Sequence, residues 1–279
     1  MSGRIRWGTS SWSEKAWTGV FYPEGLALRD QLGYYATRYD TVEADVTYYR
    51  VPDARLASGW HAKTPDHFTL SAKFPRSVVH GGEGAAPDSA KVLEREATAR
   101  DVESFLESMR LLGTKCGPLV LQFPYFNRSA FTSAGPFLER LDGFLGRLPR
   151  DFRYGVELRN KSWVGEPLLG ILHNHRAALV LVDLAYLPHP AEWLERLDPF
   201  TTDFAYCRLI GDRKRIDSMT DRLDRTILDQ GPRLERWAEL LRSALERVPE
   251  TYVYANNHYA GYAPDTIDDL RARVEAPRG

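Results

Sequence analysis

Eight short apolar runs alternate with segments of helical periodicity along most of this 279-residue chain. Each run is too short for an ordinary helix, and several are rich in the Val, Tyr and Phe residues that favour strands. The runs span residues 5–8, 41–46, 68–73, 118–123, 154–158, 178–183, 204–211 and 251–256. We therefore expect eight strands.

The segments between most of these runs place apolar residues at spacings of three and four, which puts them on one face of a helix. The pattern is clearest in residues 88–112 and 232–248, and Pro232 suits the first turn of the second helix. The remaining predicted helices span residues 26–38, 133–147 and 263–274. The connections after the second and sixth runs carry weaker patterns, so we expect only short helices there.

Alternation of strand and helix implies parallel strands joined by right-handed crossovers. Eight such units close most naturally into a (β/α)₈ barrel of the TIM type. An open doubly wound sheet is the rival, but it usually has a glycine-rich phosphate turn after an early strand, and the sequence has none. No low-complexity tract or linker divides the chain, so residues 1–279 are predicted to form a single domain.

The charges of the chain nearly cancel, with 37 Lys and Arg against 38 Asp and Glu. A net charge of −1 gives no global basic field, so we expect no nucleic-acid partner, although a local basic patch remains compatible with one. The longest apolar stretch, residues 177–182, is too short to span a bilayer, and the N-terminus lacks the apolar region of a signal peptide. We therefore expect a cytoplasmic protein without a membrane partner, whereas the sequence carries no signal for an oligomeric state.

The common cofactor and metal motifs are absent from the sequence. It contains no Walker loop, no dinucleotide fingerprint and no H-E-x-x-H. The only cysteines, Cys116 and Cys207, lie far apart and cannot build a four-thiolate site. We therefore expect no cofactor and no resident metal.

Polar residues gather at the carboxyl ends of the predicted strands, where TIM barrels carry their chemistry. A buried charge is costly unless it is paired, so these residues suggest a polar pocket at the barrel mouth. The candidates for ligand binding are Trp12, Lys73, His80, Gln122, Arg159, Trp163, Arg208, Asn256, Asn257 and His258, and the candidate catalytic residues are Glu157, Glu43 and Asp183. A purely structural alternative is that the charged residues pair with one another only to close the barrel end.

The main functional hypothesis is an acid/base enzyme acting on a small polar, sugar-like or anionic substrate. Glu157 would work with Glu43 or Asp183, while the cations bind an anionic part of the substrate. Glu157 and Arg159 lie two residues apart on one strand and so share a face. We expect the neighbouring cations to keep Glu157 ionised at neutral pH, which suits a base or an electrostatic anchor.

Two other functions remain open at the level of sequence. A metal-assisted phosphoesterase acting on nucleic acid or on a phosphorylated substrate would use Glu43, Glu157, Asp183 and His258 as ligands. Histidines are scarce and basic residues share the predicted pocket, which disfavours a cation there. A ligand-binding barrel without chemistry would be held together by the same ion pairs.

Long segments of the chain are similar to one known family. They are WGTSSWSEKAWTGVFYPEGL (7–26), YYATRYDTVEADVTYYRVP (34–52), TPDHFTLSAKFPRSVVH (64–80), LGTKCGPLVLQFP (112–124), YGVELRNKSW (154–163), LVLVD (179–183), YCRLIG (206–211) and YVYANNHYAGYAPDT (252–266). Together they resemble the domain of unknown function 72 family, also called YecE-like. The resemblance implies a TIM barrel and no established activity. The family tends to carry Asn where this chain has Asp45, and His where it has Asn160 and Ile210.

Overall fold

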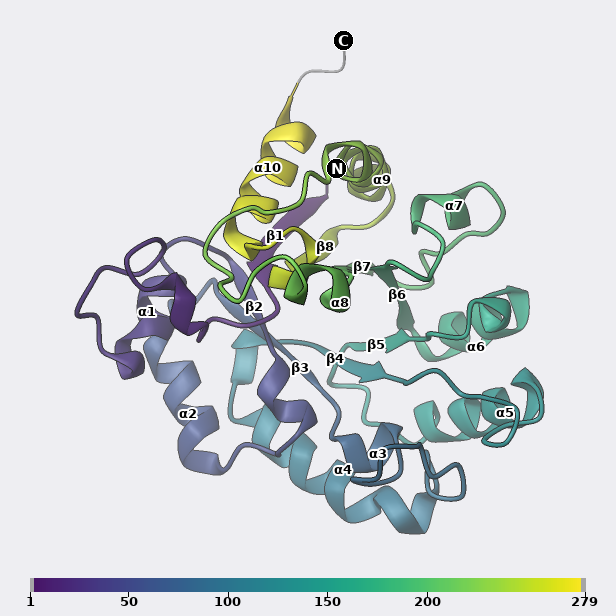
Figure 1. The fold of residues 1–279 in the computed structure, drawn as a ribbon. Helices are drawn as coiled ribbons and strands as arrows, with labels where there is room; N and C mark the ends of the chain where they lie inside the picture. Colours follow the sequence, from purple (N-terminus) through teal and green to yellow (C-terminus); the bar gives the residue numbers. More distant parts are fainter. Residues whose placement is uncertain (1–2, 277–279) are drawn as a thin grey trace.

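The computed structural model describes residues 3–276, in which eight parallel strands alternate with helices (Figure 1). The strands lie in the order β1-β8-β7-β6-β5-β4-β3-β2. They are β1 (Arg4–Thr9), β2 (Thr41–Ala44), β3 (Thr69–Lys73), β4 (Cys116–Gln122), β5 (Tyr154–Glu157), β6 (Ala177–Leu184), β7 (Phe204–Gly211) and β8 (Glu250–Ala255). All eight predicted strands are confirmed, and the fold is a nearly closed (β/α)₈ barrel.

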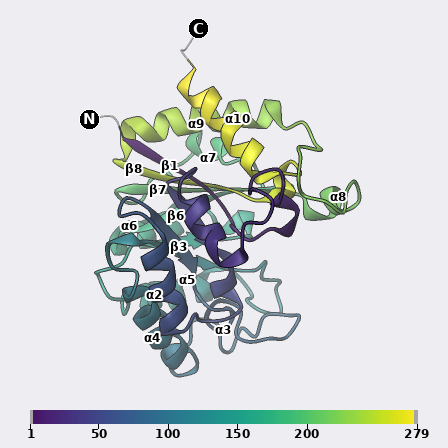
Figure 2. The same cartoon turned by 90° about the vertical axis from the view of Figure 1, so that its left-hand side faces the viewer.

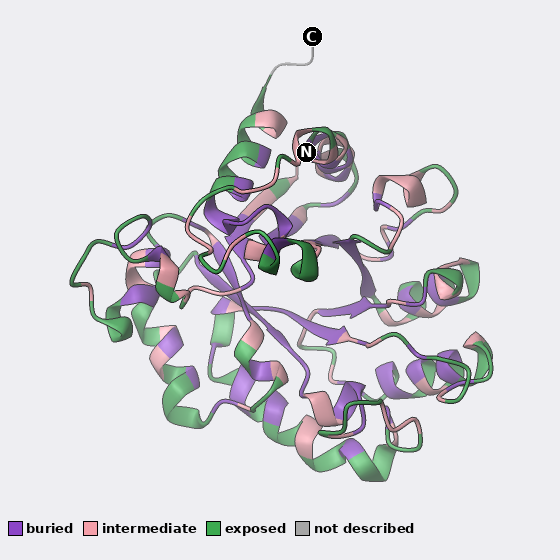
Figure 3. Cartoon of the chain, in the orientation of Figure 1, coloured by how far each residue is buried: buried purple, intermediate pink, exposed green. Residues whose placement is uncertain are grey.

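The helices surround the strands, and Figure 3 shows their buried faces turned toward the sheet and their exposed faces turned outward. The α-helices are α1 (Gln31–Tyr35), α2 (Ala54–Lys63), α3 (Arg76–Val79), α4 (Arg95–Arg110), α5 (Ala134–Leu145), α6 (Glu166–His175), α7 (Ala191–Leu194), α8 (Arg213–Asp217), α9 (Gly231–Arg247) and α10 (Ala263–Glu275). The 3₁₀ turns are η1 (Lys15–Trp17), η2 (Leu28–Asp30), η3 (Asp45–Tyr48), η4 (Gly113–Lys115), η5 (Lys161–Trp163) and η6 (Asn257–Tyr259). Within residues 3–276, no helix is long and apolar enough to cross a membrane.

Three helix predictions need correction. The connection after β2 carries the ten-residue helix α2, whose N-cap Asp53 accepts a hydrogen bond from the amide of Leu56 at 2.8 Å. The predicted helix 88–112 begins only at α4, because residues 88–94 turn back against α3 and the residue after it, with the amide of Leu93 donating to the carbonyl of Val78 and the amide of Asp88 to that of His80. The predicted helix 26–38 is reduced to η2 and the short helix α1.

The seam between β1 and β2 closes through a side chain. The hydroxyl of Tyr35 accepts a hydrogen bond from the amide of Thr9 at 2.7 Å and lies 3.2 Å from the carbonyl oxygen of Thr41. Gly8 permits this approach, because a Cβ at that position would lie only 2.0 Å from the same carbonyl oxygen. One backbone hydrogen bond, from the amide of Asp40 to the carbonyl of Trp7, also joins the two segments.

Polar side chains are stacked in layers inside the barrel. At the amino end, Glu250 pairs with Arg6 and Arg153. In the middle, the hydroxyl of Tyr254 lies 2.7 Å from Thr41 Oγ1 and 2.8 Å from Ser71 Oγ. A charged layer follows at the carboxyl ends of the strands, the end from which α8 projects in the side view of Figure 2. This layer contains the candidate site.

Candidate functional site

Arg208 of β7 is the centre of the charged layer. Its Nε and Nη2 each donate a hydrogen bond of 2.7 Å to the carboxylate of Glu43, and its Nη1 donates to Glu157 and, at 2.8 Å, to Gln122. Glu43 and Glu157 are fully buried, and the side chain of Arg208 is almost so. The guanidinium therefore lies between two carboxylates that come from β2 and β5.

Lys73 and Asp45 extend this layer toward solvent. The ammonium of Lys73, at the end of β3, lies 3.2 Å from Glu43 Oε2 and forms a closer ion pair with Asp45 Oδ1. Asp45 begins η3 directly after β2, and its side chain is 35% exposed, whereas that of Lys73 is 6% exposed. The ion-pair series Glu157–Arg208–Glu43–Lys73–Asp45 thus runs from a fully buried carboxylate to one that reaches water.

The surroundings push the pKa values of the neighbouring carboxyls apart. Burial alone would raise the pKa of Glu43, but Arg208 and Lys73 outweigh it and lower the pKa to about 2. The pKa of Glu157 is lowered in the same way, since Arg208, Arg159 and Lys73 together outweigh its burial. The Asp45 side chain is partly exposed as a whole, but its Oδ1 is buried against the cluster. This burial raises the pKa of Asp45 to about 6, against the pull of Lys73 and with the support of the Glu43 charge.

Two further side chains complete the cluster. The hydroxyl of Tyr206 donates to Glu43 Oε1 at 3.1 Å, and burial together with that carboxylate raises the pKa of Tyr206 well above its ordinary value. Arg159 lies with its Nε 3.3 Å from Glu157 Oε1, and its side chain is 27% exposed. β5 ends at Glu157, so Arg159 lies just beyond the strand and not on its face, but the two side chains contact each other and the neighbouring cations lower the pKa of the Glu157 carboxyl.

Asp183 does not join this cluster, so the expectation that it faces the same pocket is wrong. Its neighbour Val182 pairs in register with Arg208 and faces the barrel interior, so Asp183 points outward because successive strand residues alternate. There it accepts hydrogen bonds from Trp237 Nε1 at 2.9 Å and from the hydroxyl of Tyr259 at 3.1 Å, and it pairs with Arg233. Asp183 thus ties α9 and η6 to β6.

Both tryptophans among the predicted ligand-binding residues lie apart from the charged layer. Trp163 packs against Phe126 and Phe137, with ring centroids 6.0 and 5.2 Å away. Its neighbour Asn160 holds the same loop, donating to the carbonyl of Phe126 at 2.7 Å. Trp12 contacts Trp60 edge to face at 5.6 Å, on the outer side of the barrel rim. Neither indole therefore lines the cluster around Arg208.

The predicted residues after β8 make local contacts. Asn257 Oδ1 accepts a hydrogen bond from the amide of Ala263 at 2.9 Å, so its side chain holds the first residue of α10 against η6. Asn256 Oδ1 lies 2.8 Å from His258 Nδ1, and His258 Nε2 lies 3.1 Å from Asp217 of α8. These three side chains connect the end of β8 to α8.

His80 lies in the loop after α3. Its ring is buried, and its Nδ1 lies 3.2 Å from the carbonyl oxygen of Gly82. Burial and the neighbouring Arg76 lower the pKa of His80. The imidazole is therefore neutral at neutral pH and is engaged by its own glycine-rich loop.

The four residues that the metal hypothesis needs do not meet. Arg208 occupies the space between Glu43 and Glu157, Asp183 lies outside the barrel, and His258 is engaged by Asp217. Across the described span from residue 3 to residue 276, no group of three or more His, Cys, Asp or Glu side chains is placed to hold a metal ion. The four ligands that the metal-assisted alternative would need are therefore not brought together.

Sequence reasoning missed two members of the cluster. Asp45 lies two residues after Glu43, and this spacing alone indicates that the two side chains share a strand face. The partial exposure of Asp45 could not be predicted, because it arises at the turn η3, where the strand has ended. Tyr206 lies two residues before Arg208 on the same face of β7, and the same period-two spacing would have found it.

Comparisons with known proteins agree on one family. The family model described as "Protein of unknown function DUF72" matches residues 6–279. UPF0759 protein YecE of Escherichia coli strain K12 is 29% identical over 157 residues, which are 56% of this chain and 48% of the relative. The match thus spans about half the length of that curated relative.

Solved structures support the same assignment. A DUF72 family protein from Thermotoga maritima MSB8 is 29% identical, with a TM-score of 0.71 over 98% of this chain and 99% of the other. A D-psicose 3-epimerase crystallised in the presence of D-fructose is 10% identical, with a TM-score of 0.50 over 98% of this chain and 97% of the other, and this likeness concerns the fold alone. The predicted resemblance is confirmed, and the chain belongs to the DUF72 family.

Proposed function

We propose that this barrel is an acid/base enzyme for small anionic substrates and that Asp45 is the group that transfers the proton. One observation carries the proposal. Among the three carboxyls of the charged layer, Asp45 alone reaches solvent, and its pKa is raised to about 6. A group with a pKa near the working pH exchanges protons most effectively with a substrate.

The other two carboxyls take a different role. Glu43 and Glu157 both have lowered pKa values and are held by Arg208, so neither has a proton to give at neutral pH. They act as positioning residues that fix Arg208 and, through Glu43, the ammonium of Lys73. Carboxyls whose surroundings separate their pKa values in this way divide into acid/base and electrostatic roles.

Arg159 supports an anionic substrate, because this partly exposed cation pairs with Glu157, at the other end of the ion-pair series from Asp45. Among the residues from 3 to 276, Glu157 is the single carboxylate partner of Arg159, at 3.3 Å, and the Arg159 side chain is 27% exposed. A guanidinium with free donors binds a carboxylate or phosphate through paired hydrogen bonds. The substrate class that fits is a small polar molecule with one such group, for example a sugar acid or a sugar phosphate.

The test combines ligand binding with proton transfer. The protein is incubated in D₂O with a panel of small hydroxy acids, oxo acids, sugar acids and sugar phosphates. Thermal shift reports binding, and ¹H NMR reports both exchange of carbon-bound protons and new products. We expect at least one compound to bind and to react, and we expect Asp45→Asn to abolish the reaction while binding persists.

The matched control is Asp66→Asn, since Asp66 is fully exposed and precedes β3 at the opposite end of the barrel. This control should react like the wild type. An Asp45→Asn variant that reacts at the wild-type rate would contradict the proposed role of Asp45. Compounds that bind through Arg159 but never react would instead support a ligand-binding barrel.

A further inference from the structure

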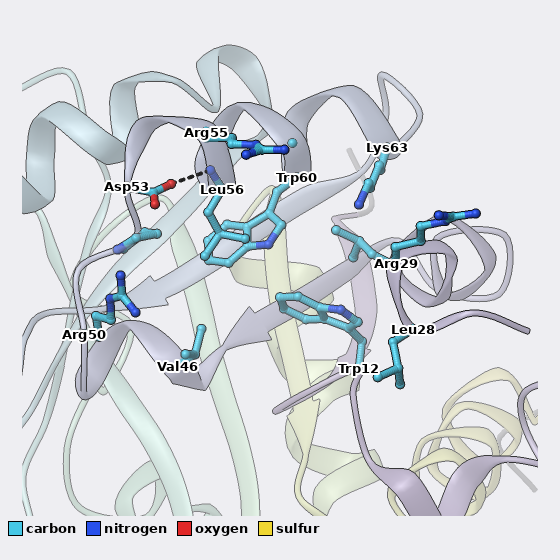
Figure 4. Close-up of a pocket in the computed structure, with 13 residues that line it drawn as sticks. Trp12, Leu28, Arg29, Val46, Arg50, Asp53, Arg55, Leu56, Trp60 and Lys63 are labelled. Carbon is cyan, nitrogen blue, oxygen red and sulfur yellow. Dashed lines mark hydrogen bonds between the residues drawn. The ribbon is translucent and has the colours of Figure 1, made fainter.

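A pocket of about 750 Å³ lies beside the barrel rim, between the segment after β1, the residues around η2 and helix α2 (Figure 4). It lies next to the charged layer along the chain, because Val46 lines it directly after Asp45 in η3. None of the residues around Arg208 lines it. The pocket is therefore a separate place where a ligand could bind.

The centre of this pocket is apolar. Trp12 and Trp60 contact each other edge to face at 5.6 Å, and Figure 4 shows the two indoles side by side. Around them the side chains of Leu28, Val46 and Leu56 lie open to solvent, with exposures of 71%, 47% and 44%. Exposed apolar groups gathered in one concavity are typical of a binding site.

The rim of the pocket is basic. Arg29, Arg50, Arg55 and Lys63 surround the indoles in Figure 4. Within residues 3–276, none of Arg50, Arg55 and Lys63 has a carboxylate oxygen within 4.0 Å of its charged nitrogen atoms. Arg29 has only its sequence neighbour Asp30 within that distance, at 3.7 Å. The one acidic residue of the lining, Asp53, caps α2 through its hydrogen bond to the amide of Leu56.

The residues that line the pocket also disfavour some classes of ligand. It contains no Ser, Thr, Asn, Gln, Tyr or His, so few side chains can read sugar hydroxyls or the edges of a nucleic-acid base. Unpaired cations around an apolar floor instead complement an apolar body with negative charge. We propose that this pocket binds a soluble amphipathic organic anion, with an aromatic or branched aliphatic body and a carboxylate, sulfonate or phosphate group.

The volume supports a small molecule as the occupant. Pockets of about 300–1,000 Å³ enclose ligands of drug size, and this one lies within that range. The site stands on its own residues and is independent of the proton transfer proposed for Asp45.

Two fluorescent probes test the proposal with the 279-residue chain. The anion 8-anilinonaphthalene-1-sulfonate carries an aromatic body and a sulfonate, and N-phenyl-1-naphthylamine is its uncharged counterpart. We expect the anion to bind at one site per chain with a blue-shifted emission. In the triple variant Arg50→Gln/Arg55→Gln/Lys63→Gln, its Kd should rise about tenfold, because exposed ion pairs are individually weak but act together here. Binding of the uncharged probe should stay unchanged.

A matched triple variant, Arg100→Gln/Arg128→Gln/Lys214→Gln, removes the same charges from exposed positions outside the pocket lining. This control should bind both probes like the wild type. The variant Leu56→Glu places an acid on the exposed floor at the third residue of α2, a position that favours a carboxylate, so the fold is retained. It should weaken both probes.

Three results would overturn the proposal. The first is that the anion does not bind or binds without saturation. The second is an equal loss of affinity in the pocket triple and the control triple. The third is that the protein binds anionic lipid vesicles tightly but does not bind the free anionic probe, and that the pocket triple variant loses the vesicle binding. This result would make a membrane surface the partner.

Discussion

Glu43 of β2 accepts two hydrogen bonds of 2.7 Å from Arg208 of β7, one from Nε and one from Nη2. In the strand order of the sheet, β2 and β7 are separated by four other strands, so this bidentate pair spans the barrel interior. β2 lies at one edge of the sheet, beside the β1–β2 seam, and the contact links it to β7 across the barrel interior. The contact is therefore both the core of the candidate site and a tertiary tie that helps to close the barrel.

We predict that Arg208→Gln destabilises the protein strongly, because it leaves Glu43 and Glu157 buried without their shared cation. Removing one partner of a buried ion pair costs about 3–5 kcal/mol. The free energy of unfolding in urea measures this loss. Arg208→Lys keeps the charge but not the planar fork, so it should restore only part of the stability. A loss below 1 kcal/mol or so for Arg208→Gln would contradict the central role of the guanidinium.

The seam between β1 and β2 gives a second prediction. Tyr35→Phe removes the hydroxyl that serves the amide of Thr9, and leaving a buried donor unpaired costs about 1–3 kcal/mol. Hydrogen exchange at the Thr9 amide should become faster in this variant. Tyr34→Phe is the control, since the Tyr34 side chain is only partly buried and its hydroxyl is not at the seam. Equal effects of the two variants would contradict the bridging role of Tyr35.

The strands were predictable from the sequence because each is an apolar run of the right length between helical segments. The charged layer was predictable in part, since Glu43, Lys73, Glu157 and Arg208 all lie near the carboxyl ends of those runs. The sequence does not show which face of a strand turns inward, and this is why Asp183 was placed in the pocket.

Features that depend on turns were less predictable. The sequence predicts Asn257 as a ligand-binding residue, but its side chain accepts a hydrogen bond from the first residue of α10 because the chain turns at η6. The pocket around Trp12 and Trp60 is formed by segments from two different connections, and their approach is set by the barrel. A sequence pattern carries no signal for such a contact.

The third prediction concerns how the stability of the fold depends on pH, and it rests on Asp45. A carboxyl whose pKa is raised to about 6 in the folded state, from an ordinary value of 3.8, binds a proton more tightly when folded. Its contribution to stability therefore falls as the pH rises from about 4 to about 6. In Asp45→Asn this fall is absent, so the variant should gain stability relative to the wild type between pH 4 and pH 7 or so. Urea unfolding across this range measures the difference, and a constant difference would contradict the raised pKa.

Glu43 determines how stability changes at acid pH, where its effect has the opposite sign to that of Asp45. Its pKa is lowered from 4.5 to about 2, so its ionised form is favoured in the folded state. The stability that it contributes is fully present above pH 4.5 and is lost as the pH falls toward 2. Glu43→Gln should therefore flatten the acid limb of the wild-type profile. An acid limb of unchanged slope would contradict the pairing of Glu43 with Arg208 and Lys73.

The last prediction separates a structural carboxylate from a ligand-binding cation. Asp183 accepts hydrogen bonds from Trp237 and Tyr259 outside the barrel, so Asp183→Asn should cost about 1–3 kcal/mol of unfolding free energy. It should leave the affinity for the anionic compounds that bind the barrel mouth unchanged. In the described part of the chain Arg159 has one carboxylate partner, and its side chain is partly exposed, so Arg159→Gln should change stability by less than about 1 kcal/mol but reduce that affinity at least tenfold or so. Thermal shift and ligand titration on both variants give the comparison. If Asp183→Asn lost the ligand and Arg159→Gln kept it, the two residues would have to exchange roles.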